Sequence, residues 1–223
     1  MRPQGMLLEV VMTSFVFVDT ETTGIDRNKE RLLEVACIEV VDRQKTGRQL
    51  HQYINPEKPV SDGAFRVHGI SWEQVKEEPV FAQVAESIID QLKGRVFVAH
   101  NAPFDLGFLN MEFAKAGFNF KIGRDVEVLD TLKLAKEIYP GQKNSLDALC
   151  TRLSIDRSHR VYHGALLDTE LLIQVYIGMT QKQERFSLKS TQALVEAKPY
   201  SIIADILAEE DNSRHIAYME DLA

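Results

Sequence analysis

A short apolar run that ends in acidic residues constrains this chain more than any other feature. Phe15-Val16-Phe17-Val18 has the pattern of a strand buried on both faces, and Asp19 and Glu21 follow it at once. Because side chains two residues apart leave a strand on the same face, both carboxylates should project from one side of the sheet. The pattern favours an α/β fold in which a buried strand carries two acids to its end.

Two later motifs carry further acids and a histidine. His100-Asn101-Ala102-Pro103-Phe104-Asp105 follows a second apolar run at 96–99, and His163-Gly164-Ala165-Leu166-Leu167-Asp168 opens an apolar helical pattern. With Asp19 and Glu21, these motifs offer four carboxylates and one histidine to a single site. Oxygen ligands in that number suit Mg²⁺ or Mn²⁺, and two such ions commonly support in-line attack on a phosphodiester. The sequence therefore predicts a metal-dependent nuclease.

Each of these residues also has a simpler explanation. Asp19 and Glu21 could be loop acids at the end of a strand, and Asp105 a first-turn acid that the helix dipole favours. Asp168 could be a solvated helix residue, and His163 a histidine at a helix start or on the surface. Each explanation is acceptable alone. All of them together would make the shared placement a coincidence, so we favour one common site.

His163 and Asp168 lie five residues apart, with Asp168 expected on the helix and His163 in the loop before it. Both side chains can then flank one cavity. Asp168 can hold a metal ion there while His163 takes the proton from the attacking water, because histidine is the residue type that titrates near neutral pH. Activity should therefore rise as this histidine deprotonates.

The remaining patterns predict a mixed sheet with helices around it. A turn at Lys45-Thr46-Gly47 favours a hairpin between the second and third strands, and prolines and a glycine in 56–63 indicate a loop. Asp130 should cap the helix that follows it, and Asn144 the next one. We expect strands at 15–18, 32–41, 49–54, 96–99 and 126–129, and helices at 81–89, 104–116, 131–138 and 165–179.

The composition fits one domain with some residues left for a tail, since 44% of the 223 residues are hydrophobic. Cys37 and Cys150 lie in apolar surroundings and should be buried thiols rather than a disulfide.

The sequence shows no apolar stretch long enough to cross a bilayer and no convincing signal peptide, so we expect a soluble cytoplasmic protein without membrane contact. The net charge of −7 is unusual for a protein that binds nucleic acid alone, and it favours work inside a complex.

The combination of motifs resembles the DEDD superfamily of 3′–5′ exonucleases, in the branch whose fifth residue is a histidine. The resemblance covers residues from about 15 to 180 and is strongest to the epsilon, or proofreading, subunits of bacterial DNA polymerase III. Val67-His68-Gly69-Ile70 and the segments 144–150 and 163–168 carry this closer similarity. The resemblance implies an α/β, ribonuclease-H-like (DnaQ-like exonuclease) fold with a mixed five-stranded sheet flanked by helices.

The resemblance also implies a role for each motif residue. Asp19, Glu21 and Asp168 would hold two divalent cations, Mg²⁺ or Mn²⁺, and Asp105 would complete the site directly or through water. His163 would be the catalytic general base. The binding site for the terminal nucleotide would be formed by Asp19, Glu21, Thr22, Gly63, His68, Asn101, Phe104 and Asp168.

Three of these nucleotide-site residues differ in what they can offer. Gly63 stands where similar chains can carry an acid, so only its backbone can contact the nucleotide. His68 has an alternative role as a loop histidine paired with backbone. Phe104 would contact the base or the sugar through apolar or stacking contact.

The implied activity is the removal of mispaired 3′-terminal nucleotides from DNA during replication, with release of nucleoside 5′-monophosphates. A stand-alone enzyme that trims RNA 3′ ends is an alternative within the same superfamily. Such enzymes generally work as homodimers, and the long tail of this chain argues against that. A purely structural subunit of the polymerase is an alternative from another class, and the complete set of metal ligands argues against it.

Residues 1–180 are expected to form the exonuclease domain, and 181–223 a linker and partner-binding tail. Gln183, Phe186 and Leu188 have the spacing of peptides that dock on bacterial sliding clamps, and a plain linker explains them equally well. Apolar residues at helical spacing in 201–210 and 213–223 favour a segment that orders on the polymerase alpha subunit. A helix folded back on the nuclease is the alternative. DNA 3′ ends and a small theta-like subunit are the other expected partners.

Overall fold

The computed structural model describes residues 13–158 and 162–190, with side chains as far as residue 181. These residues form the five predicted strands and the predicted helices, together with two short helices at 62–68 and 72–75 that the patterns do not predict. In chain order the elements are β1 (Ser14–Thr22), β2 (Leu32–Val41), β3 (Gln44–Tyr53), α1 (Asp62–His68), α2 (Trp72–Val75), α3 (Phe81–Leu92), β4 (Val96–Ala99), α4 (Ala102–Lys115), β5 (Val128–Asp130), α5 (Thr131–Ile138), α6 (Leu146–Leu153) and α7 (Ala165–Ser190).

The strands form one mixed sheet in the order β3-β2-β1-β4-β5. The neighbours β1 and β2, and β2 and β3, are antiparallel, whereas β4 pairs in parallel with both β1 and β5. The predicted five-stranded mixed sheet is therefore confirmed. Because β1, β4 and β5 are parallel, their carboxyl ends meet at one edge, and the helices α4 and α5 begin there directly after β4 and β5.

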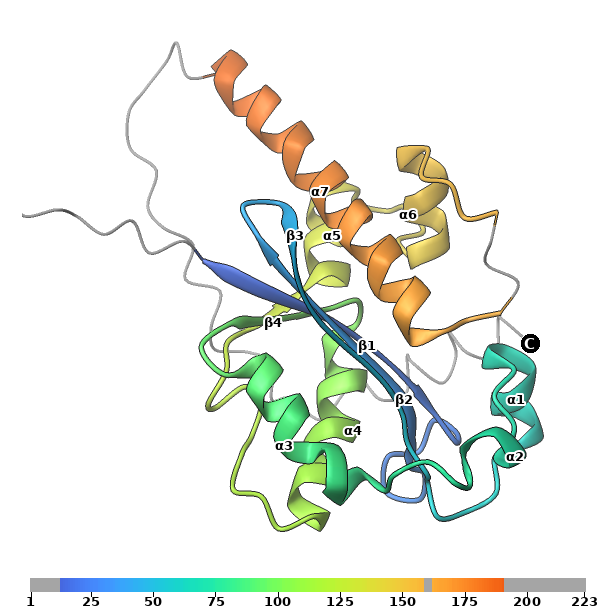
Figure 1. The fold of residues 1–223 in the computed structure, drawn as a ribbon. Coiled ribbons are helices and arrows are strands. Elements are labelled where there is room, and N and C mark those ends of the chain that lie inside the picture. The colour runs from blue at the N-terminus through green and yellow to red at the C-terminus, as the bar shows by residue number, and fades with distance from the viewer. Residues whose placement is uncertain (1–12, 159–161, 191–223) are drawn as a thin grey trace, which may run out of the picture.

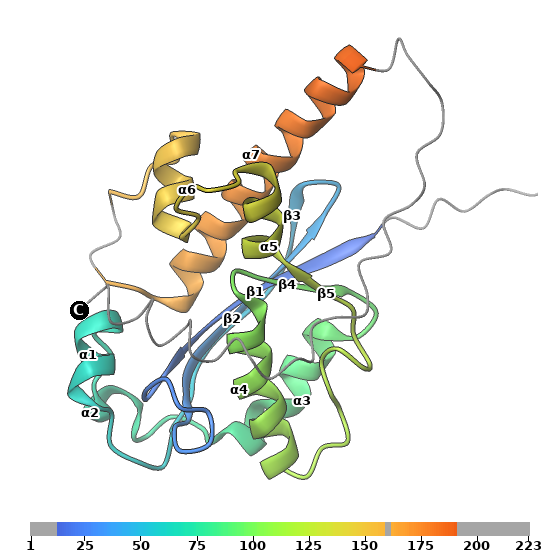
Figure 2. The ribbon, with the colours of Figure 1, turned by 180° about the vertical axis from the view of Figure 1, so that it is seen from behind.

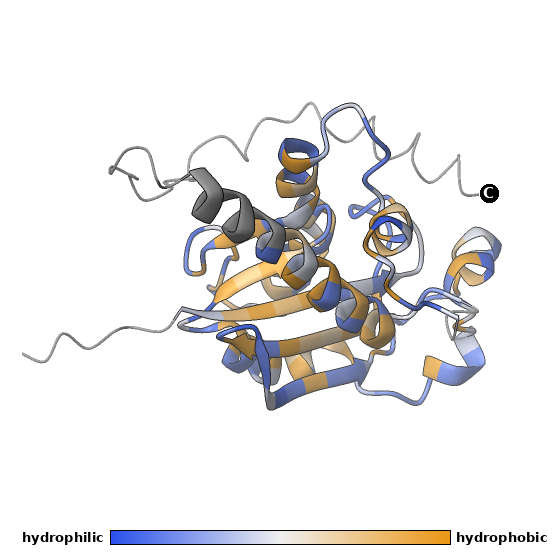
Figure 3. Ribbon diagram, turned by 90° about the horizontal axis from the view of Figure 1, so that it is seen from above, coloured by the Kyte–Doolittle hydropathy of each residue, from blue (hydrophilic) through white to orange (hydrophobic). Residues whose placement is uncertain are grey.

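Helices cover both faces of this sheet. The helices α3 and α4 pack on one face, and α5, α6 and α7 pack on the other (Figures 1 and 2). Val16 and Val18 on β1 belong to the core beneath α3 and α4, whereas Phe17 between them packs with Leu171 of α7. Viewed from above, hydrophobic residues run along the strands beneath α7 (Figure 3). This alternation is the reason that β1 reads as a continuous apolar run.

The same alternation decides where the acids of β1 point. β1 continues through Thr22, so Asp19 and Glu21 lie within the strand rather than after it. They share the face of Phe17, which is the face that α7 covers. Thr20 points to the opposite face, where its Oγ1 donates a hydrogen bond of 2.7 Å to Oδ1 of Asp105 on α4.

The turn between β2 and β3 lies at Asp42 and Arg43, so the prediction of a turn at Lys45-Thr46-Gly47 is wrong. Asp42 and Arg43 have φ angles of 50° and 61°. Two consecutive positive φ angles make the type I′ turn that matches the twist of paired strands. Gly47, with φ of 90°, instead lies where the register between β2 and β3 shifts, and it allows β3 to bulge there.

Two helix starts also differ from the prediction. The expected loop over 56–63 ends at Ser61, whose side chain accepts a hydrogen bond from the Ala64 N–H and so begins α1. α6 is capped by Ser145 rather than Asn144, because the Ser145 hydroxyl accepts from the Ala148 N–H. The predicted cap of α5 is confirmed: Asp130 accepts from the Leu132 N–H at 2.9 Å.

α7 is longer than expected, since it continues past the predicted end at 179 to Ser190. Cys37 and Cys150 are both buried and are not joined in a disulfide, as predicted, and burial raises the pKa of Cys37 to about 12. Within the described part of the chain, no helix is both long and apolar enough to cross a membrane.

Glu39 on β2 provides a pH-dependent test of the fold. Its carboxylate accepts hydrogen bonds from Arg95, Thr46 and Ser14 at 2.5, 2.7 and 2.8 Å. Burial raises the pKa of Glu39, but these three donors together lower it from 4.5 to about 2. The unfolded chain therefore takes up a proton near pH 4.5 that the folded chain binds only near pH 2.

We expect Glu39→Gln to lower the free energy of unfolding by about 2 kcal/mol at neutral pH, as is usual for hydrogen bonds to a charged group. The difference from the wild type should shrink as the pH falls below 4.5 toward 2, because the wild type loses its advantage there. Urea unfolding of both proteins at several pH values measures it. A difference that stays constant as the pH falls would contradict this assignment.

Candidate active site

Glu21, His163 and Asp168 come together although they are distant in sequence. One ligand atom from each of the three side chains lies within 4.8 Å of the other two. The Nδ1 atom of His163 is 3.3 Å from Oδ2 of Asp168. Glu21 and Asp168 are buried and His163 is partly exposed, so the group has an open side toward solvent. This is the arrangement that the motif order predicts for its histidine and two of its acids.

The start of α7 delivers two members of this group. Asp168 lies in the first turn of α7, where its N–H donates to the carbonyl of Gly164 at 2.9 Å. His163 lies just before the helix, and its N–H donates to the carbonyl of Val67 in α1 at 3.2 Å. α1 therefore supports the histidine loop from outside, while the helix fixes the aspartate. The loop-then-helix placement expected for His163 and Asp168 is confirmed.

Asp19 and Asp105 are not part of the close group of three within the described residues. Asp19 shares the α7 face of β1 with Glu21 and is partly exposed. Asp105 reaches the strand end from the first turn of α4 and accepts the hydrogen bond from Thr20. Burial, with a smaller contribution from the charge of Asp130, raises the pKa of Asp105 to about 7. A cation beside Asp105 would favour its charged form.

His68 is held by backbone groups at both ring nitrogens. Nδ1 accepts from the Ile70 N–H at 3.0 Å, so the ring proton of the neutral form lies on Nε2, which is 3.2 Å from the carbonyl of Thr22. Burial lowers the pKa of His68 to about 4, which keeps the ring neutral at physiological pH. These contacts match the pairing with backbone that the alternative role predicts, although His68 is the last residue of α1 and does not lie in a loop. A contact with the nucleotide stays a prediction.

The other predicted nucleotide-site residues lie around the carboxyl end of β1 and the start of α4. Thr22 is buried, and its hydroxyl donates to the carbonyl of Gly24 at 2.7 Å. Asn101 adopts a left-handed backbone with φ of 67° and precedes α4, on which the Phe104 ring packs 5.0 Å from that of Phe108. Gly63 is exposed in the first turn of α1.

One buried acid, Asp130, and one partly buried histidine, His100, hold the backbone around the start of α4. Asp130 accepts from the Asn101 N–H at 3.1 Å as well as capping α5. His100 lies between Thr131 Oγ1 and the carbonyl of Asn144, at 3.0 and 2.9 Å, and burial lowers its pKa. His100 therefore ties the end of β4 to the first residue of α5 and to the segment just before α6, and it is not part of the group of three.

Tyr162 is a neighbour of the site that the motifs did not single out, and it contacts Gly69 of the Val67-His68-Gly69-Ile70 motif. Tyr162 directly precedes His163 in the chain and is 57% exposed. Gly69, which ends α1 with φ of 71°, lies beneath the ring: a Cβ at Gly69 would be 3.2 Å from the ring atoms of Tyr162. The sequence alone does not reveal this contact, because Gly69 and Tyr162 are far apart along the chain.

This contact predicts a difference between two glycine substitutions. Gly69→Ala should destabilise the protein through left-handed strain of about 1–2 kcal/mol and by displacing the Tyr162 ring. Gly47 also has a positive φ, of 90°, but a Cβ there would have no atoms within 4 Å. Gly47→Ala should therefore lower the stability through backbone strain alone. Thermal unfolding of both variants measures the difference. Equal losses would show that the ring contact does not contribute.

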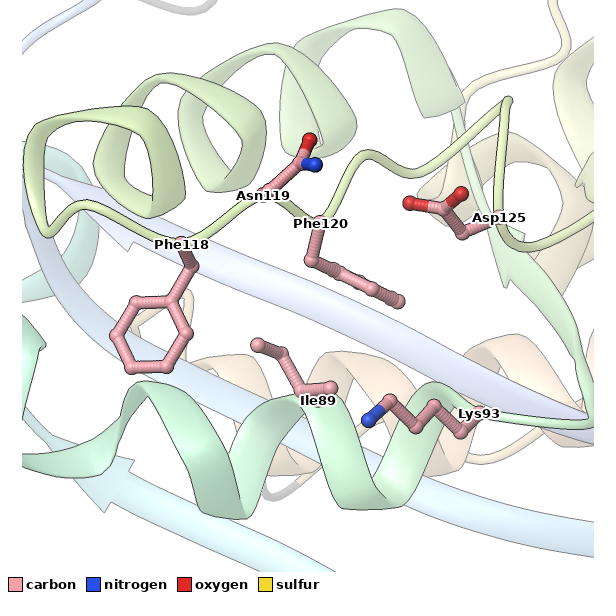
Figure 4. Close-up of a pocket in the computed structure, with 6 residues that line it drawn as sticks. All are labelled: Ile89, Lys93, Phe118, Asn119, Phe120 and Asp125. Carbon is pink, nitrogen blue, oxygen red and sulfur yellow. The ribbon is translucent and has the colours of Figure 1, made fainter.

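A shallow surface pocket of about 410 Å³ lies elsewhere, between α3 and the segment after α4 (Figure 4). In the close-up the side chains of Phe118 and Phe120 point toward α3. Its lining residues are Ile89, Lys93, Phe118, Asn119, Phe120 and Asp125. They include no residue that the motifs assign to catalysis or to nucleotide binding, so this pocket is separate from the candidate site.

The predicted clamp-binding residues Gln183, Phe186 and Leu188 lie on the last turns of α7, where the structure gives the backbone alone. The predicted tail segments 201–210 and 213–223 lie outside the described residues. The clamp and tail assignments therefore stay predictions.

The donor set fits a divalent cation. Carboxylate oxygens of Glu21 and Asp168 are hard ligands of the kind that Mg²⁺ and Mn²⁺ prefer, and a histidine nitrogen beside them is acceptable to Mn²⁺. The buried carboxylates of Glu21 and Asp168 also repel each other, and a cation bound between them would offset this repulsion. The residues that the structure brings together are consistent with the predicted metal site.

The same chain matches known exonucleases. A family model described as an exonuclease (RNase_T) matches residues 16–176. The DNA polymerase III subunit epsilon of Pasteurella multocida (strain Pm70) is 40% identical over 215 residues, which cover 94% of this chain and 81% of that protein. The subunit of the same name from Escherichia coli (strain K12) is 40% identical over 182 residues, covering 79% of this chain and 75% of that protein.

Solved structures agree on the fold. The zinc-bound complex of E. coli exonuclease I with single-stranded DNA has a TM-score of 0.69 at 20% identity, covering 80% of this chain and 43% of that longer chain. Exonuclease X in complex with 5′-overhanging duplex DNA has a TM-score of 0.57 at 25% identity, covering 77% of this chain and 92% of that one. The chain therefore belongs to the exonuclease family and, within it, to the DNA polymerase III epsilon subunits.

Proposed function

We propose that this protein is a metal-dependent 3′–5′ exodeoxyribonuclease that removes mispaired 3′-terminal nucleotides as the proofreading subunit of the bacterial replicative polymerase. The observation that carries the proposal is the approach of Glu21, His163 and Asp168 to within 4.8 Å at the edge where β1, β4 and β5 end. Membership of the epsilon subunits supports DNA as the substrate.

In this proposal the acids hold two divalent cations and the histidine moves a proton. Asp19, Glu21 and Asp168 would be direct ligands, with Asp105 completing the site directly or through water. Mg²⁺ or Mn²⁺ bound there would supply an acidified water and stabilise charge on the phosphate. His163 would accept the proton of that water. With its ring proton on Nδ1, toward Asp168 Oδ2, its Nε2 carries the basic lone pair.

The surrounding residues would orient the 3′-terminal nucleotide. Thr22 and Gly63 would offer backbone contacts, Phe104 an apolar face, and Asn101 polar groups at the start of α4. His68 would act mainly by fixing the carbonyl of Thr22, because both of its ring nitrogens already face backbone groups.

Membership of the epsilon subunits supports an assembly with DNA and the polymerase III complex. We propose a cytoplasmic complex in which residues 181–223 bind the polymerase alpha subunit, with 1–180 as the exonuclease domain. Gln183, Phe186 and Leu188 would bind the sliding clamp, and a small theta-like subunit would bind the nuclease. The net charge of −7 is consistent with a substrate delivered by the polymerase rather than captured alone.

The test compares 3′ ends. The purified chain is given Mg²⁺ or Mn²⁺ and a labelled DNA duplex with a mispaired 3′ terminus, the matched duplex, or single-stranded RNA of the same sequence. We expect the mispaired DNA end to be hydrolysed fastest, because it frays most readily, with nucleoside 5′-monophosphates as products. Faster hydrolysis of RNA would favour an RNA-trimming enzyme, and no hydrolysis with either metal would contradict the proposal.

A further inference from the structure

Glu34 is a buried acid that the nuclease motifs leave unassigned. It lies on β2 directly opposite Glu21 of β1 and is 2% exposed. Its Oε2 accepts a hydrogen bond of 3.0 Å from the N–H of Ala165, the first residue of α7. Its Oε1 is 2.6 Å from Nε2 of His51 on β3. One carboxylate thus joins the sheet to the start of the helix that carries Asp168.

The contacts of Glu34 are of the kind that a carboxylate makes at the start of a helix. The first N–H groups of a helix have no partner within the helix, and a carboxylate there is stabilised by the helix dipole. His51 supplies a second polar contact, and its ring packs against that of Tyr53 with centroids 5.2 Å apart. A buried acid so close to Glu21 nevertheless adds like-charge repulsion. An apolar side chain at this position would avoid that cost, so stability alone does not account for a charged one.

The bond to Ala165 lies, along the chain, between His163 in the loop before α7 and Asp168 in its first turn. Ala165 follows His163 by two residues and precedes Asp168 by three. The N–H of His163 is bonded to α1, and the N–H of Asp168 to the carbonyl of Gly164. The bond to Glu34 directly links the first residue of the helix to the sheet that carries Glu21. A loss of that link would let the first turn of α7 move relative to β1.

We infer that Glu34 is a positioning residue, which holds the first turn of α7 so that His163 and Asp168 face Glu21, with His51 fixing its second oxygen. The inference rests on the proposed function, since it assigns Glu34 to the metal site formed by those residues. Partners of this kind behind metal ligands typically change metal affinity or activity by about 10–100-fold when they are removed.

Four variants of the full-length chain test the inference. Glu34→Ala removes both contacts, whereas Glu34→Gln keeps an oxygen that can accept from the Ala165 N–H but loses the charge. His51→Ala leaves the Ala165 bond in place and removes only the contact of His51 with Oε1. Glu39→Gln is the matched control, because Glu39 is a hydrogen-bonded acid on the same strand whose partners lie away from α7. Circular dichroism first shows which variants are folded.

Two readouts then separate positioning from a merely structural role: the rate of hydrolysis per folded molecule, and direct Mn²⁺ binding by calorimetry. We expect Glu34→Ala to lose about 10–100-fold in both, His51→Ala a smaller part of that, and Glu34→Gln to recover most of it. Glu39→Gln should match the wild type in both readouts.

Several outcomes would overturn the inference. Glu34→Ala with wild-type Mn²⁺ affinity and rate per folded molecule would make Glu34 a residue of stability alone. Glu34→Gln as impaired as Glu34→Ala would show that the charge, not the bond to α7, matters. If Glu34→Ala does not fold, Glu34→Met takes its place, because methionine fills a similar volume but cannot accept from the Ala165 N–H, and wild-type Mn²⁺ affinity and rate in that variant would have the same consequence. Asp168→Ala in the same assays tests the proposed function separately, because its full activity would refute the site itself.

Discussion

Asp168→Ala is expected to abolish hydrolysis of DNA 3′ ends. The residue is buried in the first turn of α7, within 4.8 Å of Glu21 and His163, and we propose that it holds a metal ion directly. Alanine removes the oxygen ligands and leaves the helix and its core contacts in place. Single-turnover hydrolysis of a labelled oligonucleotide with Mg²⁺ or Mn²⁺ measures the loss. Residual activity close to that of the wild type would remove Asp168 from the metal site.

His163→Ala should behave differently in the same assay. It should keep metal and DNA binding and lose about 100-fold or more in rate, which is the usual range for a general base. Because His163 lies in the loop before α7, its substitution should leave the melting temperature nearly unchanged. Turnover near the wild-type rate at neutral pH would refute its assignment as the base. Comparable loss of Mn²⁺ binding in both variants would make His163 a ligand instead.

Arg31→Met is expected to have the largest effect on stability. The guanidinium of Arg31 forms a two-point contact with Glu112 of α4, at 2.6 and 3.0 Å, and the Glu112 side chain is only 2% exposed. Methionine fills a similar volume but leaves a buried carboxylate without its cation. Removal of one partner of a buried ion pair typically costs about 3–5 kcal/mol, and the partial exposure of Arg31 places the expected loss near the lower value.

Arg48→Met is the matched control for this substitution. Arg48 pairs with Asp90 at 2.5 Å, but the two side chains are 36% and 75% exposed, so the loss should stay below about 1 kcal/mol. Urea unfolding of the two variants against the wild type gives both values. Similar losses for Arg31 and Arg48 would show that burial does not set the strength of these pairs.

The sequence predicts the central strands and the acids on them because each rests on a local pattern. The apolar runs before Asp19 and at 96–99 have the two-face burial of central strands, and the predicted sheet is confirmed. The acid Asp130 is correctly placed as a helix cap, since its partner is two residues away. Patterns of this kind are complete within a few residues, so a single sequence reveals them.

The errors have physical causes as well. The glycine at position 47 favours the prediction of a turn there. The turn instead lies at Asp42 and Arg43, which adopt positive φ angles although neither is a glycine. The short helix α1 is specified by its ends, Ser61 and Gly69, rather than by an apolar period. Glu34 has no motif at all, because its partner Ala165 is 131 residues away and donates through its backbone. Contacts of that range depend on tertiary structure.

The most direct test of the central claim is to locate the metal. Crystals of the protein soaked with Mn²⁺ and a nucleoside 5′-monophosphate can be measured for anomalous scattering from manganese. We expect two manganese peaks at the edge where β1 ends, with carboxylate oxygens of Asp19, Glu21 and Asp168 at about 2.0–2.3 Å, distances usual for such ions. The absence of any peak beside Glu21 and Asp168 at saturating Mn²⁺ would contradict the account.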